Sequence, residues 1–415
     1  MQTSAIKRCR GAYANRGRYG ENPIFIIVSL LRLLGRYLAS AWRLSLAVYG
    51  ARFYMFCGLI CVSSLAMAGS WIPAASMTTA RLTHTATLLA NGKVLVVAGY
   101  GSSWLASAEL YDPATNSWSS AGSISSPRNA HTATLLANGK VLIAGGAVSA
   151  SYLASADLYD PASNTWSPAT PMNAARSDHT ATLLVNGKVL VAGGNGADGT
   201  PVNSAELYNP TSNTWSPAGS MVVAAVGRSD TLLANGKVLV SGGYNSGSTF
   251  AHAEIYDPAS NSWASTSDMG TSRESGTNLL LGNGKVIAAG GPGQSSIRTI
   301  SAELYDPMTA TWAQTGPLST GRWLHSSTLL PDGSVLVVGG EGNNTTYLAS
   351  TEAYNAGSAS WTPAGLMVKA RKWHTATLLN NATVLVVGGY GPGVVALNTA
   401  EIYLWQDGIF RNGFD

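Results

Sequence analysis

Arginine and histidine recur together along this chain of 415 residues, and histidine is a side chain suited to metal binding and acid–base chemistry. Five of the six histidines follow an arginine by three positions: Arg81/His84, Arg128/His131, Arg176/His179, Arg322/His325 and Arg371/His374. A metal needs ligand atoms about 2 Å from one point, whereas a residue present once per repeat is spread over a symmetric fold. We therefore predict that these pairs serve packing and hydrogen bonding, and we predict neither a metal site nor a cofactor.

An acidic residue also recurs once per repeat, at Glu109, Asp157, Glu206, Glu254, Glu303, Glu352 and Glu401. A ring of acids suits general acid–base work. Buried acids need partners, however, so we expect each one to pair with a repeated arginine or a backbone amide. No nucleophile–base pair, phosphate-cradling glycine motif or metal-ligand spacing stands out in the sequence, and we assign no catalytic residue.

Four consecutive repeats depart from the arginine–histidine pattern. The fourth has Ala225 in the arginine position and Arg228 in the histidine position, and the fifth has Gly276 in the histidine position. Trp323 lies beside the arginine of the sixth repeat, and Trp373 lies beside the histidine of the seventh. A pocket lined by arginine and tryptophan, with a gap at Gly276, suits a carboxylate, a sugar or a peptide segment. The predicted ligand-binding residues are Arg228, Glu274, Gly276, Trp323, His325, Trp373 and His374. Drift in a duplicated scaffold explains the same departures equally well.

These residues are positioned by repeats of 48 or 49 residues. Six segments similar to SAELYDPATNSW end at Trp118, Trp166, Trp215, Trp263, Trp312 and Trp361, and a shortened copy, TAEIYLW, ends at Trp405. Each unit contains four candidate strands: an alternating segment such as HTATLL, an apolar run that mostly ends in Gly-Gly, the SAELYDP segment, and the tryptophan segment. We expect Asn91-Gly92 to form a two-residue hairpin in which both residues have positive φ.

The Gly-Gly after an apolar strand, the Tyr-Asp-Pro and the tryptophan resemble the signature of the kelch family, and the resemblance covers residues 71–405. It implies an all-β chain folded as a seven-bladed β-propeller of four-stranded kelch-type blades; a β-solenoid is the rival, but its repeat is usually shorter. WIPAASM, at Trp71 to Met77, is comparable to WSPAGSM at Trp215 to Met221. We therefore expect the N-terminal strand to close the ring as the outer strand of the last blade, with Trp405 as the competitor.

The chain divides into four regions. Residues 1–52 form a basic N-terminal extension, which a start-site error would explain, and residues 53–68 have the order of a signal peptide that ends in Ala66-Met67-Ala68. Residues 69–405 form the propeller, and residues 406–415 form a C-terminal tail. We expect a secreted, periplasmic or cell-surface protein, and contact with a membrane only through an uncleaved leader.

The propeller region differs from the leader in charge and in cysteine content. Nine basic residues and one acid precede residue 53, which leaves 16 basic and 20 acidic side chains in the remainder. This mildly acidic body gives no electrostatic footprint for nucleic acid. All three cysteines precede residue 69, which excludes disulfides and thiolate metal sites from the propeller region.

The kelch resemblance implies partner binding through loops at one face. We expect an exported binding or scaffold protein that presents one propeller face to a protein or carbohydrate ligand. Galactose-oxidase-like copper enzymes of this fold use a tyrosine cross-linked to a cysteine, and the cysteine-free body excludes that chemistry. The alternatives are a sugar-acting enzyme of the sialic-acid mutarotase type and a purely structural envelope component, since fold alone does not identify function.

Overall fold

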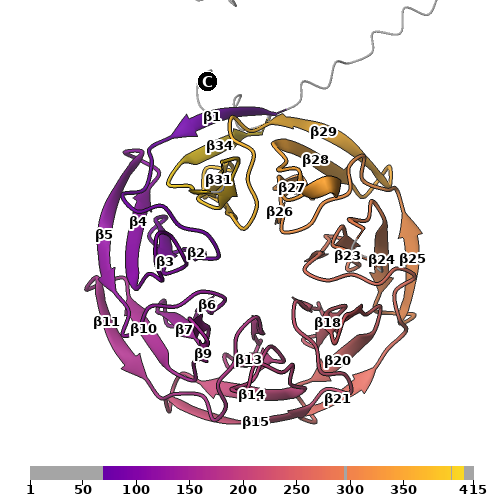
Figure 1. Cartoon of the computed structure of the whole chain (residues 1–415). Coiled ribbons are helices and arrows are strands. Elements are labelled where there is room, and N and C mark those ends of the chain that lie inside the picture. Colours follow the sequence, from indigo (N-terminus) through magenta and orange to yellow (C-terminus); the bar gives the residue numbers. More distant parts are fainter. Residues whose placement is uncertain (1–68, 294–296, 394, 406–415) are drawn as a thin grey trace, which may run out of the picture. The chain divides into compact units, whose positions relative to one another are not determined.

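The computed structural model describes residues 69–293, 297–393 and 395–405. They form seven four-stranded antiparallel sheets, arranged as blades around a central channel (Figure 1). The predicted seven-bladed propeller is confirmed. The extension at 1–52, the signal peptide at 53–68 and the tail at 406–415 lie outside the described residues. Within the described ranges, no helix is long and apolar enough to cross a membrane.

Each blade runs from an inner strand beside the channel to an outer strand at the rim. Blades one to four contain β2 (Thr85–Leu88), β3 (Val94–Val97), β4 (Ser107–Asp112) and β5 (Ser117–Ser123); β6 (Thr132–Leu135), β7 (Val141–Ala144), β10 (Ala156–Asp160) and β11 (Thr165–Ala169); β12 (Thr180–Leu183), β13 (Val189–Ala192), β14 (Ser204–Asn209) and β15 (Thr214–Ser220); and β16 (Ser229–Leu232), β17 (Val238–Ser241), β20 (Ala253–Asp257) and β21 (Ser262–Ser265). Blades five to seven contain β22 (Thr277–Leu280), β23 (Val286–Ala289), β24 (Ala302–Asp306) and β25 (Thr311–Thr315); β26 (Ser326–Leu329), β27 (Val335–Val338), β28 (Ser350–Asn355) and β29 (Ser360–Leu366); and β30 (Thr375–Leu378), β31 (Val384–Val387), β34 (Ala400–Leu404) and β1 (Ser70–Ala74).

The antiparallel order gives the propeller two different faces. The loop face carries the segments that enter each inner strand and the loops that follow the Gly-Gly pairs. Three of these loops form short hairpins and one contains a 3₁₀ turn: β8 (Ala147–Val148) with β9 (Ser151–Tyr152), β18 (Tyr244–Asn245) with β19 (Ser248–Thr249), β32 (Tyr390–Gly391) with β33 (Val395–Ala396), and η3 (Asn343–Thr345). The opposite, hairpin face carries the tight turns between the first and second strands and between the third and fourth.

The N-terminal strand closes the ring, as predicted. β1 pairs antiparallel with β34, and Trp71 lies opposite Tyr403. The same register places Trp118 opposite Tyr111 in the first blade. Trp405 follows β34 and belongs to no strand. β1 therefore covers the outer edge of β34 without a disulfide, and the last blade has four strands like the others.

The turn between the first and second strands is not the two-residue hairpin that we predicted. Leu89 and Lys93 form the last pair (N···O 2.8 Å), so three residues make the turn. Only the third of these, Gly92, has a positive φ, of 82°. Asn91 instead accepts a hydrogen bond from the Lys93 amide with its side-chain oxygen (3.1 Å). The Asn-Gly pair thus fits the three-residue hairpin with a terminal left-handed residue.

The hydrophobic core lies between blades. Val94 and Val96 of β3 pack with Leu385 of the seventh blade, whereas the alternate residue Leu95 packs with Val141 of the second. Because successive strand residues point to opposite faces, the continuous apolar run of β3 serves two interfaces. Each blade therefore depends on both of its neighbours.

Candidate functional site

A buried arginine fastens the loop face to the middle of the blade in six of the seven blades. In the sixth blade, Arg322 Nη1 donates to the carbonyl oxygens of Gly339 (2.8 Å) and Ser350 (3.0 Å). Its Nη2 donates to Glu352 Oε1 (2.6 Å), and Glu352 Oε2 accepts from the Ser319 amide (2.7 Å). The arrangement recurs at Arg81, Arg128, Arg176, Arg273 and Arg371. The predicted pairing of the repeated acid is confirmed, and the pair is internal to each blade.

Five histidines link neighbouring blades through their Nε2 atoms. Each Nε2 lies 2.7–3.0 Å from a hydroxyl oxygen at the start of the preceding inner strand: His84/Thr375, His131/Thr85, His179/Thr132, His325/Thr277 and His374/Ser326. Burial and the nearby Arg322 lower the pKa of His325 to about 3, so its ring is neutral at pH 7. Among the described residues, no three histidine, cysteine, aspartate or glutamate side chains gather as a metal site would require.

The fourth blade compensates internally for its missing arginine. Arg228 starts three residues later than the usual arginine, yet its Nη1 still reaches Glu254 Oε1 (3.1 Å). Its side chain is 2% exposed, and its Nε and Nη2 atoms have no hydrogen-bond partner. His252 Nε2 lies 3.7 Å from the same carboxylate oxygen. The Arg228 guanidinium is thus engaged inside the blade rather than presented on the loop face.

Other polar groups replace the histidine contact on either side of the fourth blade. Thr182 donates to Asp230 at one junction, and Ser229 Oγ donates to the carbonyl oxygen of Gly276 (2.9 Å) at the other. Asn278 Nδ2 adds a bond to Ser241 Oγ (2.8 Å). A Cβ at Gly276 would lie 3.1 Å from two carbonyl oxygens. A side chain at Gly276 would therefore crowd the backbone at the end of β23.

The residue two places after each arginine position has a left-handed backbone. Its φ lies between 46° and 59° at Thr83, Ala130, Asp178, Gly227, Ser275, Leu324 and Trp373. Where these residues bond to one another, the amide of one blade donates to the carbonyl of the preceding blade, as from Trp373 to Leu324 (3.1 Å) and from Thr83 to Trp373 (3.2 Å). We call these seven residues the mouth ring, because they encircle the loop-face end of the channel. Their backbones are alike, whereas their side chains differ from blade to blade.

Two acids approach each other near the mouth ring. Burial, and then the nearby Asp178 carboxylate, raise the pKa of Glu274. A Cβ at Gly227 would lie 2.7 Å from Glu274 Cγ. The glycine of the fourth blade, which we did not single out in the sequence, thus provides the space that Glu274 occupies.

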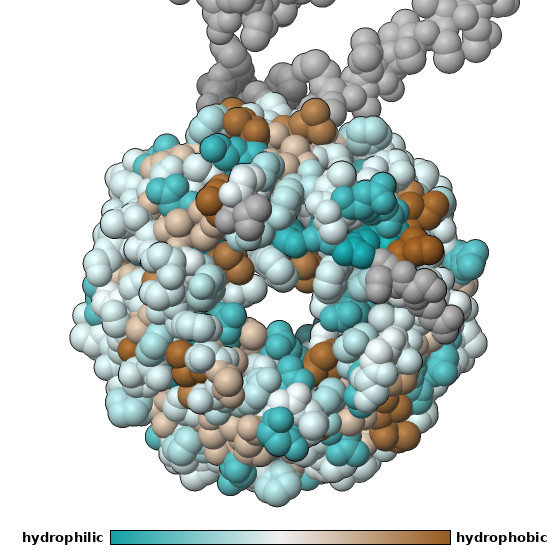
Figure 2. Space-filling view, in the orientation of Figure 1, coloured by the Kyte–Doolittle hydropathy of each residue, from teal (hydrophilic) through white to brown (hydrophobic). Residues whose placement is uncertain are grey.

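A charged cluster joins blades five, six and seven on the loop face. Glu341 accepts hydrogen bonds from Arg298 through Oε1 and from Lys372 through Oε2. The guanidinium carbon of Arg298 lies 5.1 Å from the ring centre of Trp323, and the Lys372 ammonium lies 4.3 Å from that of Trp373. Both distances are within the range of cation–π attraction. Figure 2 shows this face, with hydrophilic residues gathered between blades five and six and an open hole at the centre.

Two tyrosines complete the surroundings of Lys372. Its ammonium lies 5.4 Å from the ring centre of Tyr347 and 5.9 Å from that of Tyr390. Burial opposes ionisation of Glu341, but the hydrogen bonds from the two cations outweigh it and lower its pKa. We refer to these residues as the Glu341 cluster: Arg298, Trp323, Glu341, Tyr347, Lys372, Trp373 and Tyr390.

The sequence patterns brought two members of this cluster to notice, Trp323 and Trp373, and missed the acid at its centre. A signal was available, because Glu341 directly follows a Gly-Gly pair. The other copies have Tyr100, Ala147, Asn195, Tyr244, Pro292 and Tyr390 at that position. A single acid among apolar and neutral residues marks a departure from the repeat. The variable loops have no shared pattern that would show which partners it meets.

Exposed apolar side chains are concentrated on the loop face. Of the eleven large ones among the described residues, eight lie there: Trp104, Val222, Tyr244, Ile297, Ile300, Leu366, Val368 and Val395. Val185 and Met308 lie on the hairpin face, and Ile72 lies on the outer strand β1. Concentrations of exposed apolar surface mark interaction sites more often than scattered single residues do.

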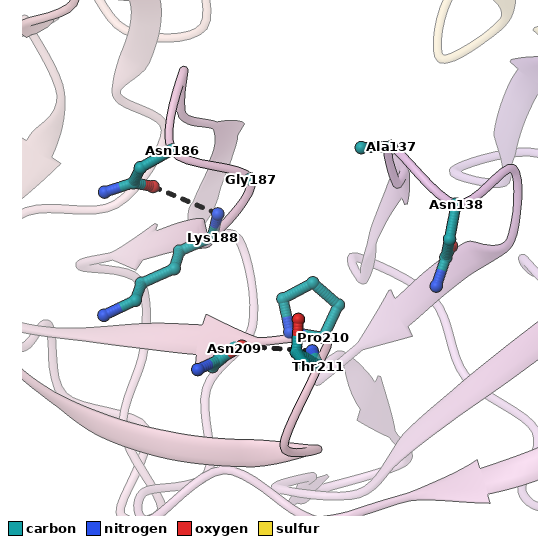
Figure 3. Close-up of a pocket in the computed structure, with 8 residues that line it drawn as sticks. All are labelled: Ala137, Asn138, Asn186, Gly187, Lys188, Asn209, Pro210 and Thr211. Atoms are coloured by element: carbon teal, nitrogen blue, oxygen red, sulfur yellow. Dashed lines mark hydrogen bonds between the residues drawn. The ribbon is translucent and has the colours of Figure 1, made fainter.

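The hairpin face has a groove between blades two and three (Figure 3). It has a volume of about 470 Å³ and is lined by Ala137, Asn138, Asn186, Gly187, Lys188, Asn209, Pro210 and Thr211. Asn186 and Asn209 accept hydrogen bonds from backbone amides of their own turns, at 3.1 and 3.0 Å. Lys188 is the single charged residue in this lining, so the groove offers few convergent polar groups for a ligand.

Comparisons with known proteins support the fold. The family model described as the attractin/LZTR1 β-propeller matches residues 158–396, and that of the KLHDC2/KLHL20/DRC7 kelch-repeats domain matches residues 67–229. No curated protein matches the chain. A solved structure of a fungal alcohol oxidase of the AA5 family, in complex with copper, is 21% identical with a TM-score of 0.68, over 82% of this chain and 78% of that one. This likeness shows the shared fold alone.

Proposed function

The chain belongs to the attractin/LZTR1 family of kelch-type β-propellers, and from this premise we propose that it is an exported binding or scaffold protein whose loop face takes up a protein or glycan ligand. The observation that carries the proposal is the concentration of exposed apolar side chains on the loop face. Kelch propellers use the loops of one face for binding, and here that face also carries the residues that vary most between blades.

Three residues of the predicted site remain in this proposal: Trp323, Trp373 and Glu274. All three are half-buried, so part of each side chain is accessible. Arg228 and His374 are buried and His325 is half-buried, and all three side chains are engaged within or between blades. A side chain at Gly276 would crowd two backbone carbonyl oxygens. We therefore assign these four a structural role.

The test begins with a glycan and peptide array, which supplies a ligand. We then expect Ile300→Ser, on the loop face, to weaken binding of that ligand by about tenfold, since an exposed apolar anchor is worth about 1.4 kcal/mol or more. Met308→Ser is the matched control, because Met308 is an exposed apolar residue of the hairpin face. If Met308→Ser loses binding while Ile300→Ser binds like the parent protein, the site lies on the hairpin face and the proposal is wrong.

Export rests on the signal-peptide order of residues 53–68. Ala66-Met67-Ala68 has the small residues that signal peptidase requires, so we expect the mature chain to begin near Gly69. N-terminal sequencing of the exported protein measures this directly. Recovery of a membrane-bound form that retains residues 1–68 would show instead that the leader is an uncleaved anchor.

A further inference from the structure

We propose that the groove between blades two and three on the hairpin face is a second binding site, and that it takes a peptide segment in which an acidic residue lies two positions from an apolar one. The inference goes beyond the proposed function, which concerns the loop face, and does not depend on it. Three features carry it: a lysine without its usual counter-ion, a groove beside that lysine, and an exposed valine on the same turn.

A lysine of the hairpin turn pairs with an aspartate of the same blade in four of the seven blades. In the first blade, Lys93 Nζ lies 3.1 Å from Asp112 Oδ2. The contact recurs at 2.9–3.1 Å in blades two, four and five, between Lys140/Asp160, Lys237/Asp257 and Lys285/Asp306. Blades six and seven have neither charge, with Ser334/Asn355 and Thr383/Leu404 at these positions. These six blades therefore keep both charges or lack both.

The third blade keeps the lysine and lacks the acid. The strand register places Asn209 opposite Lys188, where the first blade has Asp112. Lys188 is half-buried, and it forms no ion pair within the part of the chain that the structure describes. Its positive charge is therefore without the counter-ion that the same lysine has in four other blades.

Asn209 adds a second hydrogen-bond donor beside this lysine. Its Oδ1 accepts from the Thr211 amide (3.0 Å), as Asp112 Oδ1 accepts from the Ala114 amide (3.0 Å). The Asn209 Nδ2 therefore takes the place of the acid oxygen that binds lysine in the first blade. The ammonium and the amide NH₂ cannot bond to each other, because both groups donate. A carboxylate from outside accepts from both and re-creates the ion pair of the other blades.

The groove provides room for such a carboxylate. Its volume is about 470 Å³, and Lys188 and Asn209 line it from the third blade (Figure 3). A second groove, of about 520 Å³, lies between blades three and four and shares Asn186 with the first. An extended segment that crosses the turn at Asn186 enters both grooves. The small number of polar groups disfavours a small polar ligand and suits a segment held by one charge.

An exposed apolar side chain lines the second groove. Val185 is 81% exposed, whereas blades one, two and four have alanine at this turn position. A Cβ at Gly236 would lie 3.7 Å from Val185 Cγ2, so the valine is directed toward the fourth blade. Side chains two positions apart on an extended chain point to the same side, about 7 Å from each other. An acid and an apolar residue at that spacing reach the two grooves together.

The experiment follows the backbone amide signal of Gly187, which lines the first groove, in the ¹⁵N-labelled protein. The probes are acetyl-Gly-Asp-Gly-Leu-Gly-amide and the reverse order, acetyl-Gly-Leu-Gly-Asp-Gly-amide, each up to about 10 mM, because one ion pair and one apolar contact give millimolar affinity. Versions with asparagine for aspartate, versions with serine for leucine, and inorganic phosphate are the controls. We expect at least one probe to shift the signal, with higher affinity than any control.

The decisive variant is Asn209→Asp, which re-creates the pair of four other blades and should fold normally. Its carboxylate occupies Lys188 and removes a donor, so the affinity for the probe should fall by about tenfold. Lys188→Gln should weaken binding by about fivefold, the worth of a partly exposed ion pair. Val185→Ser should weaken it by about threefold, and raised salt should weaken binding to the parent protein.

Lys285→Gln is the matched control, because Lys285 has the same position in the fifth blade and is paired with Asp306. It removes the same charge from the same face and should leave the probe affinity within about twofold of the parent. Asn209→Asp should not affect a loop-face ligand from the array, and Ile300→Ser should not affect the probe. The two proposals can therefore fail separately.

Three results would overturn the inference: no response to either probe, an equal response to the asparagine versions, and an unchanged affinity in Asn209→Asp. An equal response to phosphate or to the serine versions would show a site for anions alone, and would refute the peptide segment.

Discussion

The fourth and the sixth blades both depart from the repeat, with opposite consequences. In the fourth blade the change lies inside the sheet, and Arg228 still reaches Glu254 from its shifted position. In the sixth blade Arg322 keeps its usual contacts, and Trp323 and Glu341 are added above them. A change in the interior must be compensated within the blade, because a buried acid needs a partner. A change on the loop face adds charged and aromatic side chains without altering the contacts that hold the blade together.

The largest change in stability is expected from returning the arginine of the fourth blade from position 228 to position 225, where the other blades have it. Ala225→Arg alone sets a second guanidinium against Glu254, and Arg228→His alone removes the arginine that pairs with this buried acid. Each should lower the free energy of unfolding by about 3–5 kcal/mol, measured by urea denaturation at pH 7. The double variant restores the pattern of the other blades and should recover most of that loss.

The decisive observation is that the free-energy changes of the two single variants should not add in the double variant. We expect a coupling free energy of at least about 2 kcal/mol between positions 225 and 228. A histidine at 228 can then approach Thr180, as His179 approaches Thr132 at the preceding junction. Costs that simply add in the double variant would show that the fourth blade is not a compensated version of the others.

Most of the fold could be predicted because each local signal recurs seven times. The Tyr-Asp-Pro and Gly-Gly patterns indicated the strands, and the match of Trp71–Met77 to Trp215–Met221 indicated closure. The turn at Asn91-Gly92 was predicted wrongly because a two-residue and a three-residue hairpin share that dipeptide. The decisive difference is the position of the last backbone pair, between Leu89 and Lys93.

The site was less predictable, for a physical reason. The arginine–acid pairs lie within one repeat, so the recurrence of both residues in nearly every repeat revealed them. The partners of Glu341 come from two other blades, Arg298 43 residues before it and Lys372 31 residues after it. These loops share no spacing with the rest of the chain. The closed ring brings them together, and a pattern within one repeat contains no record of that contact.

Low pH should destabilise the junctions between blades that contain a histidine, and should not affect the two junctions that lack one. Burial lowers the pKa of His131 to about 3, below about 6.5 in the unfolded chain. Between these values the unfolded state binds more protons, so stability is full above about pH 6.5 and falls as the pH drops toward 3. Each histidine contributes a slope of about 1.4 kcal/mol per pH unit.

Chemical denaturation from pH 7 to pH 4 measures this slope. His131→Gln should reduce it by one histidine's share, whereas Ser229→Ala, at a junction without histidine, should leave it unchanged. A stability that stays flat over this range in the parent protein would mean that the buried rings do not resist protonation, and the two kinds of junction would then be equivalent.

The smallest change in stability is expected on the loop face, at Trp373. Its φ is 54°, which is uncommon for a large residue, but Ala130 holds the equivalent position in the second blade with φ 50°. Alanine is therefore compatible with this backbone, and Trp373→Ala should lower the free energy of unfolding by less than about 1 kcal/mol.

The outer-strand Trp118 is the contrasting residue, because its indole donates to the Ala75 carbonyl (2.7 Å) and packs on Tyr111. Trp118→Ala should cost about 3–5 kcal/mol of stability, as large core truncations do. Binding should show the reverse order: Trp373→Ala should lose about 1–2 kcal/mol of affinity for a loop-face ligand, and Trp118→Ala should lose none while it remains folded. If Trp373→Ala instead unfolds the protein, the added aromatic residues of the loop face are part of the scaffold, and the distinction between the two blades fails.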